Sequence, residues 1–230
     1  MKKTPQIILA LDVDTRAEAM RWVKRLYPEV GIFKVGLKLY TAGGPSIVRD
    51  IEKTGARVFL DLKFNDIPNT MADATKELLK YKVSMFTVHT LSGPAALEAV
   101  ASACAKNKTK ALGVTILTSI GARFLKDLKI TRSLAEEALY LARMAKRCGL
   151  SGVVCSAGEA VLMRKHLGRD FLIVCPGIRM KGDSRDDQSR SATPGFAASS
   201  GVDYIVVGRP VLKAKEPLKA IEAIKRQLNP

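Results

Sequence analysis

Short apolar runs alternate with longer amphipathic segments along the whole of this 230-residue chain. Eight runs have the length and composition of buried strands, at residues 7–11, 32–36, 58–62, 85–89, 112–116, 152–155, 172–175 and 204–207. The segments between them repeat their apolar residues at helical spacing, at residues 15–26, 45–53, 71–81, 94–104, 133–148, 158–166, 194–200 and 210–228. Strands that are apolar throughout are typical of a parallel sheet whose two faces are covered by helices.

Eight strand–helix units of about 29 residues each predict an α/β fold, a single-domain (β/α)8 TIM barrel over residues 1–230. An open doubly wound sheet is the alternative. It is disfavoured because the first strand-to-helix turn, Leu11-Asp12-Val13-Asp14-Thr15, lacks the glycine pattern of dinucleotide-binding sheets. The polar stretch at residues 179–192 is long for a loop in a compact domain, so we expect either a lid over a functional site or a disordered excursion.

The composition adds a strong positive charge to this picture. Hydrophobic residues make up 47% of the chain, which is enough for a substantial core. The net charge is +16, which suits a nucleic-acid binder, a protein that attracts small anions, or a basic surface without a specific partner. The cations are spread over the predicted helices and aromatic residues make up only 6%, so we favour the last interpretation and expect neither a nucleic-acid nor a membrane partner.

The cysteines and the apolar run lengths bear on the cellular compartment. The four cysteines are far apart and form no C-x-x-C pair, so we expect buried, reduced thiols in a cytoplasmic protein. The first apolar run is too short for a secretory signal, and no apolar stretch approaches the roughly 18 residues that a membrane span needs.

Charged residues interrupt the apolar pattern at the end of the third run. Asp61 and Lys63 are two residues apart, so on a strand their side chains leave the same face, and Asp66 adds a second carboxylate nearby. Burying such charges is costly unless they pair or take part in chemistry. This cluster therefore has the outline of a proton-transfer site.

Other polar residues follow the remaining strands, at the end of a barrel where catalytic groups lie. Lys34 stands among apolar neighbours and needs a partner, which favours a functional role. His89 is more often structural than catalytic, and Lys38 is expected to be a solvated loop residue. Helix capping is an alternative role for Asp12, Thr118 and Ser119, and the default role for Asn69 and Thr70.

Two glycine–arginine motifs follow the last two predicted strands, Pro176-Gly177-Ile178-Arg179 and Gly208-Arg209-Pro210. Glycine lets a ligand approach the backbone closely, and arginine offers paired donors to a phosphate. A helix that starts after Gly208 would add free N–H groups. The loops after strands seven and eight are the usual phosphate site of TIM barrels, so we expect a phosphate site here.

In this order, the motifs resemble the orotidine 5′-phosphate decarboxylase family in its bacterial form, over essentially the whole chain. The most specific match is Asp61-Leu62-Lys63-Phe64-Asn65-Asp66-Ile67-Pro68-Asn69-Thr70. The other matches are Leu9-Ala10-Leu11-Asp12, Phe33-Lys34-Val35-Gly36, Thr115-Ile116-Leu117-Thr118-Ser119, Pro176-Gly177-Ile178-Arg179, Gln188, Thr193-Pro194 and Val207-Gly208-Arg209-Pro210. The segment at residues 88–94 departs from the His-Ala-Ser-Gly-Gly of many relatives.

The resemblance implies a homodimeric barrel that uses no metal or organic cofactor. It implies conversion of orotidine 5′-monophosphate to UMP and CO2, the last step of de novo pyrimidine synthesis. Lys63 would protonate C6 within a charged array of Lys34, Asp61 and Asp66 of the partner subunit. Implied substrate contacts are the decapeptide as a whole, Asp12 and Lys34 at the ribose, Thr70 across the dimer interface, Thr118 and Gln188 at the pyrimidine, and Gln188, Arg179, Gly208 and Arg209 at the phosphate.

Three alternatives to this activity remain. Magnesium-dependent sugar-phosphate decarboxylases and hexulose-phosphate synthases share an Asp-x-Lys-x-x-Asp strand. They typically place Glu where this chain has Lys34, and a charged lysine offers a metal no lone pair. The chain could also be a catalytically inactive phosphate-binding barrel or a basic nucleic-acid binder. The complete set of charged residues argues against an inactive barrel, and the dispersed charge argues against a nucleic-acid binder.

Overall fold

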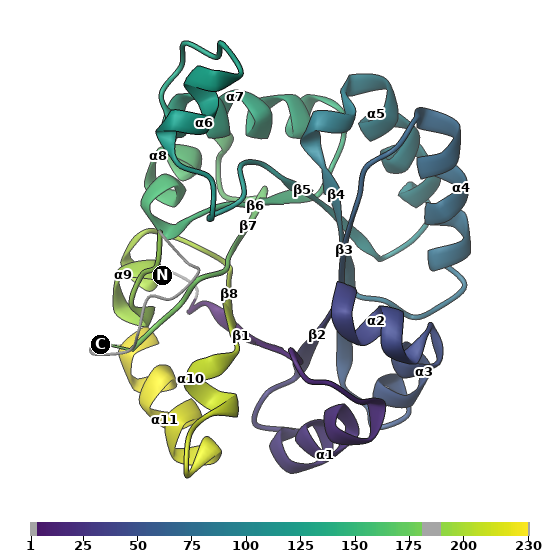
Figure 1. Ribbon diagram of the computed structural model, residues 1–230, viewed down its shortest axis with the longest axis vertical. Helices are drawn as coiled ribbons and strands as arrows, with labels where there is room; N and C mark the ends of the chain where they lie inside the picture. Colours follow the sequence, from purple (N-terminus) through teal and green to yellow (C-terminus); the bar gives the residue numbers. More distant parts are fainter. Residues whose placement is uncertain (1–3, 181–189, 230) are drawn as a thin grey trace.

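Eight parallel strands close into a barrel in chain order, in a computed structural model that describes residues 4–180 and 190–229 (Figure 1). The strands are β1 (Gln6–Ala10), β2 (Ile32–Gly36), β3 (Arg57–Phe64), β4 (Met85–His89), β5 (Lys110–Val114), β6 (Gly152–Val154), β7 (Leu172–Cys175) and β8 (Tyr204–Val207). The barrel is closed because β1 pairs with both β2 and β8, in registers that set Ile8 opposite Ile32 and Val206. The predicted (β/α)8 barrel is confirmed.

Helices connect consecutive strands and form a ring around the barrel (Figure 1). They are α1 (Arg16–Leu26), α2 (Leu37–Gly43), α3 (Ser46–Glu52), α4 (Pro68–Leu78), the 3-10 turn η1 (Thr90–Ser92), α5 (Pro94–Cys104), α6 (Ala122–Asp127), α7 (Leu134–Arg147), α8 (Ala157–Leu167), α9 (Pro194–Ser199), α10 (Arg209–Leu212) and α11 (Pro217–Leu228). Within the described ranges, no helix has the length and apolar character needed to cross a membrane. The cytoplasmic location stays a prediction.

Several element boundaries differ from the sequence prediction. The short helices α2 and α6 were not expected, because each buries a single side chain, Leu39 and Leu125, and so leaves almost no apolar periodicity. The helix predicted at 210–228 is two helices, since Pro217 at the first position of α11 begins a new one. Strand β3 continues to Phe64, beyond its predicted end.

Alternate residues of the strands divide the interior into two packed layers. Outward-facing residues such as Leu9, Phe33 and Val58 join the large core between strands and helices. Inward-facing residues form a smaller cluster inside the barrel, which consists of Ile8, Ala10, Ile32, Phe59, Met85, Leu112, Val174 and Val206. The next inward-facing positions toward the carboxyl ends of β2, β3 and β4 are Lys34, Asp61 and Thr87, so the same alternation turns from apolar to polar at the barrel mouth.

The four cysteines are free, as predicted. Cys148, Cys155 and Cys175 are buried, whereas Cys104 is half-buried and desolvation raises the pKa of its thiol to about 11. A thiol with such a pKa stays protonated at neutral pH and reacts poorly.

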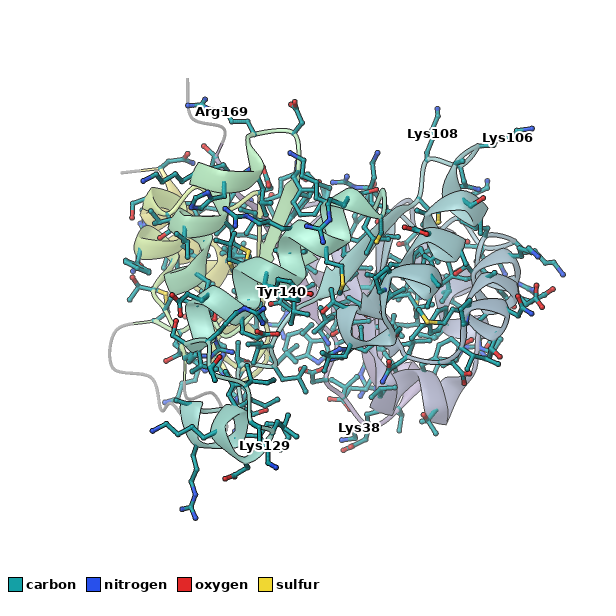
Figure 2. All side chains as sticks on the ribbon, turned by 90° about the horizontal axis from the view of Figure 1, so that it is seen from above. Lys38, Lys106, Lys108, Lys129, Tyr140 and Arg169 are labelled. Carbon is teal, nitrogen blue, oxygen red and sulfur yellow. The ribbon has the colours of Figure 1, made fainter. Side chains whose placement is uncertain are left out.

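Basic side chains project from separate parts of the surface. Figure 2 places Lys106 and Lys108 at one end of the upper edge, Arg169 at the other end of that edge, and Lys129 at the lower edge. These residues belong to different connections of the barrel, which agrees with the predicted dispersal of positive charge.

Candidate active site

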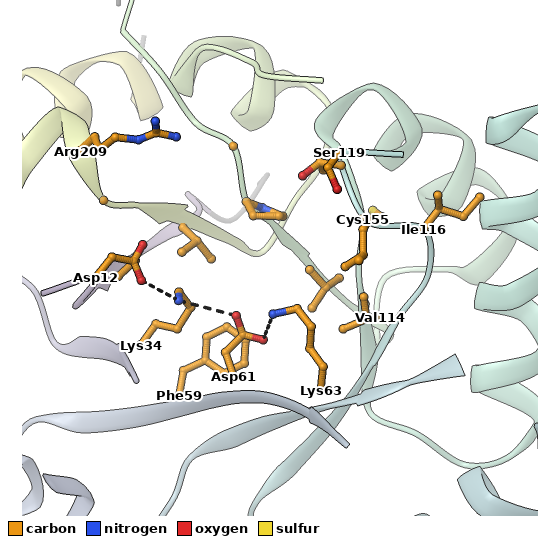
Figure 3. A pocket seen from close by; sticks show the side chains of 18 of the residues that line it. Asp12, Lys34, Phe59, Asp61, Lys63, Val114, Ile116, Ser119, Cys155 and Arg209 are labelled. Atoms are coloured by element: carbon orange, nitrogen blue, oxygen red, sulfur yellow. Dashed lines mark hydrogen bonds and ion pairs between the residues drawn. The ribbon is translucent and has the colours of Figure 1, made fainter. Parts of the chain in front are cut away.

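A cavity of about 370 Å³ opens at the carboxyl end of the barrel (Figure 3). Seven of the eight strands, or the loops that follow them, contribute to its wall. The lining residues are Ala10, Asp12, Lys34, Phe59, Asp61, Lys63, Val114, Ile116, Leu117, Thr118, Ser119, Val154, Cys155, Pro176, Gly177, Arg179, Val206, Gly208 and Arg209. One side of the cavity is therefore charged and another is apolar, as in sites that hold a small polar ligand by a few fixed groups.

Four charged residues form an alternating chain along one wall of this cavity (Figure 3). Lys34 Nζ lies 3.3 Å from Asp12 Oδ1 and 3.6 Å from Asp61 Oδ2. Lys63 Nζ donates to Asp61 Oδ1 at 2.9 Å. Because the side chains of Lys34 and Asp61 are only 12% and 14% exposed, these charges are largely removed from water and strengthen one another.

Asp61 is the centre of this chain, and its surroundings keep it ionised. Burial disfavours the carboxylate, but the positive charges of Lys34 and Lys63, with hydrogen bonds from Lys63 and Thr87, outweigh burial and lower the pKa of Asp61. The carboxylate in turn fixes two ammonium groups at the wall of the cavity. Such a preorganised set of charges can stabilise a charge that develops on a ligand without rearranging first.

Lys63 reaches this position through an irregular backbone. Its φ angle is +53°, in the left-handed region that a residue with a side chain rarely adopts. The pairing of β3 with β4 shifts between Leu60 and Phe64, so Lys63 lies in a bulge and not in a regular strand. Asp61 and Lys63 do share a face, as predicted. The direction of the Lys63 side chain, however, is set by the bulge and not by the regular alternation of a strand.

Gly36 leaves room for the Lys34 ammonium. A Cβ atom at position 36 would lie 3.0 Å from Lys34 Nζ and 3.8 Å from Asp12 Oδ1. The first distance is shorter than ordinary van der Waals contact, so a side chain here would require the ammonium to shift by a few tenths of an ångström. The glycine thus helps to position Lys34, a role beyond the motif match that the sequence offered.

The two glycine–arginine motifs both line the cavity, and the phosphate site expected there stays a prediction. Arg179 and Arg209 both line it, together with Gly177 and Gly208. Figure 3 shows the side chain of Arg209. The φ angle of Gly177 is +74°, a conformation that favours glycine. The helix expected to begin after Gly208 is α10, which has only four residues and therefore a small helix dipole.

The second half of the decapeptide lies outside the cavity. Asp66 is exposed, and within the described residues its carboxylate accepts only the N–H of Ile67, at 2.7 Å. Leu62 and Phe64 pack against the outer core, and Asn65 Oδ1 accepts the hydroxyl of Ser92 at 2.7 Å. Pro68, Asn69 and Thr70 form the first turn of α4. Gln188 lies outside the described residues, as does most of the loop predicted at 179–192.

The capping roles considered from the sequence are wrong. Helix α4 begins at Pro68, so Asn69 and Thr70 are inside it, and its N-cap Ile67 provides no side-chain hydrogen bond. The N-cap of α1 is Thr15 and not Asp12, because the hydroxyl of Thr15 accepts the N–H of Glu18. Helix α6 starts after Gly121, beyond Thr118 and Ser119.

Two further expectations concern residues beside the cavity. Lys38 lies in α2 and not in a loop, although its side chain is exposed and pairs with Asp14. His89 Nδ1 accepts the N–H of Leu91 at 3.4 Å at the start of η1, which fits a structural role. Burial and the charge of Lys63 lower the pKa of His89, so it is neutral at neutral pH.

Arg190 joins three segments behind the cavity, which sequence reasoning did not anticipate. Its guanidinium pairs with the buried carboxylate of Glu159 at the start of α8. It also donates to the carbonyl oxygens of Ile116 and Leu117, at 3.1 and 2.9 Å. These carbonyls directly precede Thr118, so Arg190 holds the end of the β7–α9 connection against the loop that carries Thr118.

Replacing Arg190 by methionine is expected to lower the free energy of unfolding by about 3 kcal/mol, because the buried Glu159 carboxylate loses its partner. Urea unfolding measures this loss. Lys80→Met is the matched control, since Lys80 and Glu77 form an exposed pair whose removal should cost about 1 kcal/mol or less. Equal losses in the two variants would contradict a stabilising role for Arg190.

This chain is similar to known proteins over nearly its whole length. Residues 5–224 match the sequence profile of the Orotidine 5'-phosphate decarboxylase / HUMPS family. The orotidine 5′-phosphate decarboxylase of Wolbachia pipientis is 43% identical over 223 residues, which are 97% of this chain and 98% of that protein. That of Geotalea daltonii is 44% identical over 224 residues, 95% of this chain and 94% of the relative. The crystal structure of the Lactobacillus acidophilus decarboxylase superposes with a TM-score of 0.87 at 35% identity, covering 98% of this chain and all of the other.

Proposed function

This chain belongs to the orotidine 5′-phosphate decarboxylase / HUMPS family, and from that premise we propose that it converts orotidine 5′-monophosphate to UMP and CO2, the last step of de novo UMP synthesis. The observation that carries the proposal is the alternating chain Lys34–Asp61–Lys63, which faces a cavity with two arginines on its rim. The ligand must therefore combine an anionic group at the rim with a reacting centre beside Lys63.

Lys63 suits the chemical step. When the bond between C6 and the carboxylate breaks, CO2 leaves and its electron pair stays on C6 as a carbanion that the ring delocalises poorly. The Lys63 ammonium, held 2.9 Å from Asp61, stabilises this charge as it forms. It then transfers a proton to C6, which gives UMP, and the neutral amine regains a proton from solvent. Lys34 and Asp61 keep the ammonium in place, so little reorganisation accompanies the reaction.

The remaining groups of the cavity suit binding. Arg179 and Arg209 are placed to hold the phosphate with paired donors, and Gly208 lets the phosphate approach the backbone. Asp12 and Lys34 would contact the ribose, and Thr118 the pyrimidine. Phosphate contacts are remote from C6, so their binding energy can be used to bring the substrate into its reactive position. The proposed contacts of Gln188 concern a residue outside the described ranges.

We further propose a homodimer whose active sites are shared, with Asp66 and Thr70 serving the site of the other chain. The exposed carboxylate of Asp66, outside the cavity of its own chain, supports this arrangement. Exposed apolar residues surround it: Ile67 follows directly, and Leu91 lies in η1, which the Ser92–Asn65 hydrogen bond joins to the same loop. Apolar side chains gathered on neighbouring loops are typical of a protein interface.

The magnesium-dependent members of this suprafamily are the alternative. Within the described residues, no group of three His, Cys, Asp or Glu side chains converges on a common point. The ammonium of Lys34 stands between Asp12 and Asp61, where it would repel a divalent cation. These features favour the cofactor-free decarboxylase.

A spectrophotometric assay with orotidine 5′-monophosphate in EDTA tests the proposal. We expect the absorbance change of conversion to UMP at the same rate with and without the chelator. A hexulose 6-phosphate tested with Mg²⁺ is the parallel substrate and should not react. No turnover of the nucleotide, or turnover that EDTA removes and Mg²⁺ restores, would overturn the proposal.

A further inference from the structure

Thr87 is a buried residue at the centre of β4, and its side chain faces the charged wall of the cavity. Its exposure is 1%, and it occupies the inward-facing position next to Met85 toward the barrel mouth. The hydroxyl is engaged twice. It donates its proton to Asp61 Oδ1 at 2.9 Å and accepts the backbone N–H of Lys63, also at 2.9 Å.

The bulge in β3 explains why this hydroxyl matters. Leu60 pairs with Phe86 and Phe64 with Val88, so four steps along β3 are matched by only two along β4. The residues between, which include Asp61 and Lys63, all lie opposite Thr87. A bulge leaves backbone groups without their ladder partners, and a buried N–H without a partner is costly. The Thr87 hydroxyl supplies that partner at Lys63, the residue of the bulge whose φ angle is positive.

The two hydrogen bonds act on the same pair of groups. Asp61 Oδ1 receives both the Thr87 hydroxyl and the Lys63 ammonium, each at 2.9 Å. One bond therefore orients the carboxylate, and the other fixes the backbone from which the ammonium extends. A residue with only a structural role would need the bond to the backbone alone.

We propose that Thr87 is a positioning residue for decarboxylation, which sets the carboxylate of Asp61 and the backbone of Lys63 in one fixed relation. This inference rests on the proposed function, because its effect is on the step in which Lys63 stabilises and protonates C6. Thr87 does not line the cavity, so it acts on the substrate only through Asp61 and Lys63.

Thr87→Val and Thr87→Ser separate the hydroxyl from the shape of the side chain. Valine is of similar size but can neither donate nor accept, whereas serine keeps both bonds. We expect Thr87→Val to lower kcat by about 10- to 100-fold, the range for loss of a hydrogen bond to a charged group, with KM within about twofold. Thr87→Ser should keep kcat within about threefold of the unchanged protein.

Thr109→Val is the matched control, since Thr109 is also buried and donates to the carbonyl of Val83 at 2.7 Å, at the start of β5 and thus far from the barrel mouth. Its kcat should not change. If Thr87→Val does not accumulate as folded protein, Thr87→Cys keeps a weak donor and should show an intermediate loss.

The outcomes separate this inference from the function on which it rests. Absence of turnover by the unchanged protein overturns the proposed function, and the inference with it. An active protein in which Thr87→Val keeps the kcat of Thr109→Val overturns the inference alone. So does a loss seen only in KM, or a Thr87→Ser variant as slow as Thr87→Val.

Discussion

Replacing Lys63 by alanine is expected to lower turnover of orotidine 5′-monophosphate by at least about 10⁴-fold, because in the proposed mechanism this one group supplies both the nearest positive charge and the proton for C6. The barrel should stay folded. Asp61 keeps the charge of Lys34 and the hydroxyl of Thr87 as partners, so its buried carboxylate is not left alone. Alanine also tolerates the positive φ angle at position 63 no worse than lysine does.

Single-turnover and steady-state formation of UMP measure this loss, and calorimetric binding of UMP shows that the site is still formed. Lys38→Ala is the control. Lys38 belongs to the helix that follows the neighbouring strand, but its side chain is exposed and pairs with Asp14 outside the cavity. It should retain full activity. Turnover by Lys63→Ala within about 100-fold of the unchanged protein would contradict the assignment of Lys63 as the proton donor.

The barrel could be predicted from the sequence because each strand is buried on both faces. An apolar run then marks a strand directly, and eight such runs with helices between them leave few possible topologies. The bounds of the individual strands and helices were harder to predict. Strand β3 continues through Asp61 and Lys63, whose charges end the apolar run before the strand ends. Helix α6 buries only Leu125, so it has no periodic signal.

Much of the candidate site could be predicted for a related reason. Asp12 follows β1, and Lys34 and Asp61 lie near the carboxyl ends of β2 and β3, which the closed barrel brings together. Thr87 was missed, although alternation along Met85, Thr87 and His89 places it on the inward face.

Other features of the site depend on contacts that no local pattern encodes. The partners of Arg190, Glu159 and Ile116, are 31 and 74 residues away in the sequence. The positive φ angle of Lys63 arises from the mismatch between β3 and β4, which neither strand reveals alone.

Asp66 follows Lys63 by only three residues in the sequence, but the structure places the two side chains apart. Lys63 lines the cavity, whereas Asp66 is exposed beyond the end of β3. An exposed carboxylate in its own chain can still complete the charged array if a second chain packs against this loop. The decapeptide would then supply each active site with residues from two chains.

Mixing two nearly inactive variants distinguishes the shared from the unshared site. In the proposed shared-site dimer, Asp66→Asn and Lys63→Ala chains mixed in equal amounts form heterodimers in which one site has the native Lys63 of the first chain and the native Asp66 of the second. Half of the dimers then hold one intact site of two, so activity should recover to about a quarter of the unchanged protein, and to about half in purified heterodimers.

Lys34→Ala mixed with Lys63→Ala is the matched control for this recovery. Lys34 and Lys63 both pair with Asp61 of their own chain, so no combination of these variants restores a native site. Activity should stay near zero although heterodimers form. The same absence of recovery in the mixture of Asp66→Asn with Lys63→Ala, in heterodimers identified by two affinity tags, would mean that Asp66 serves its own chain or none. Recovery confined to that mixture can only arise from a site that two chains build together.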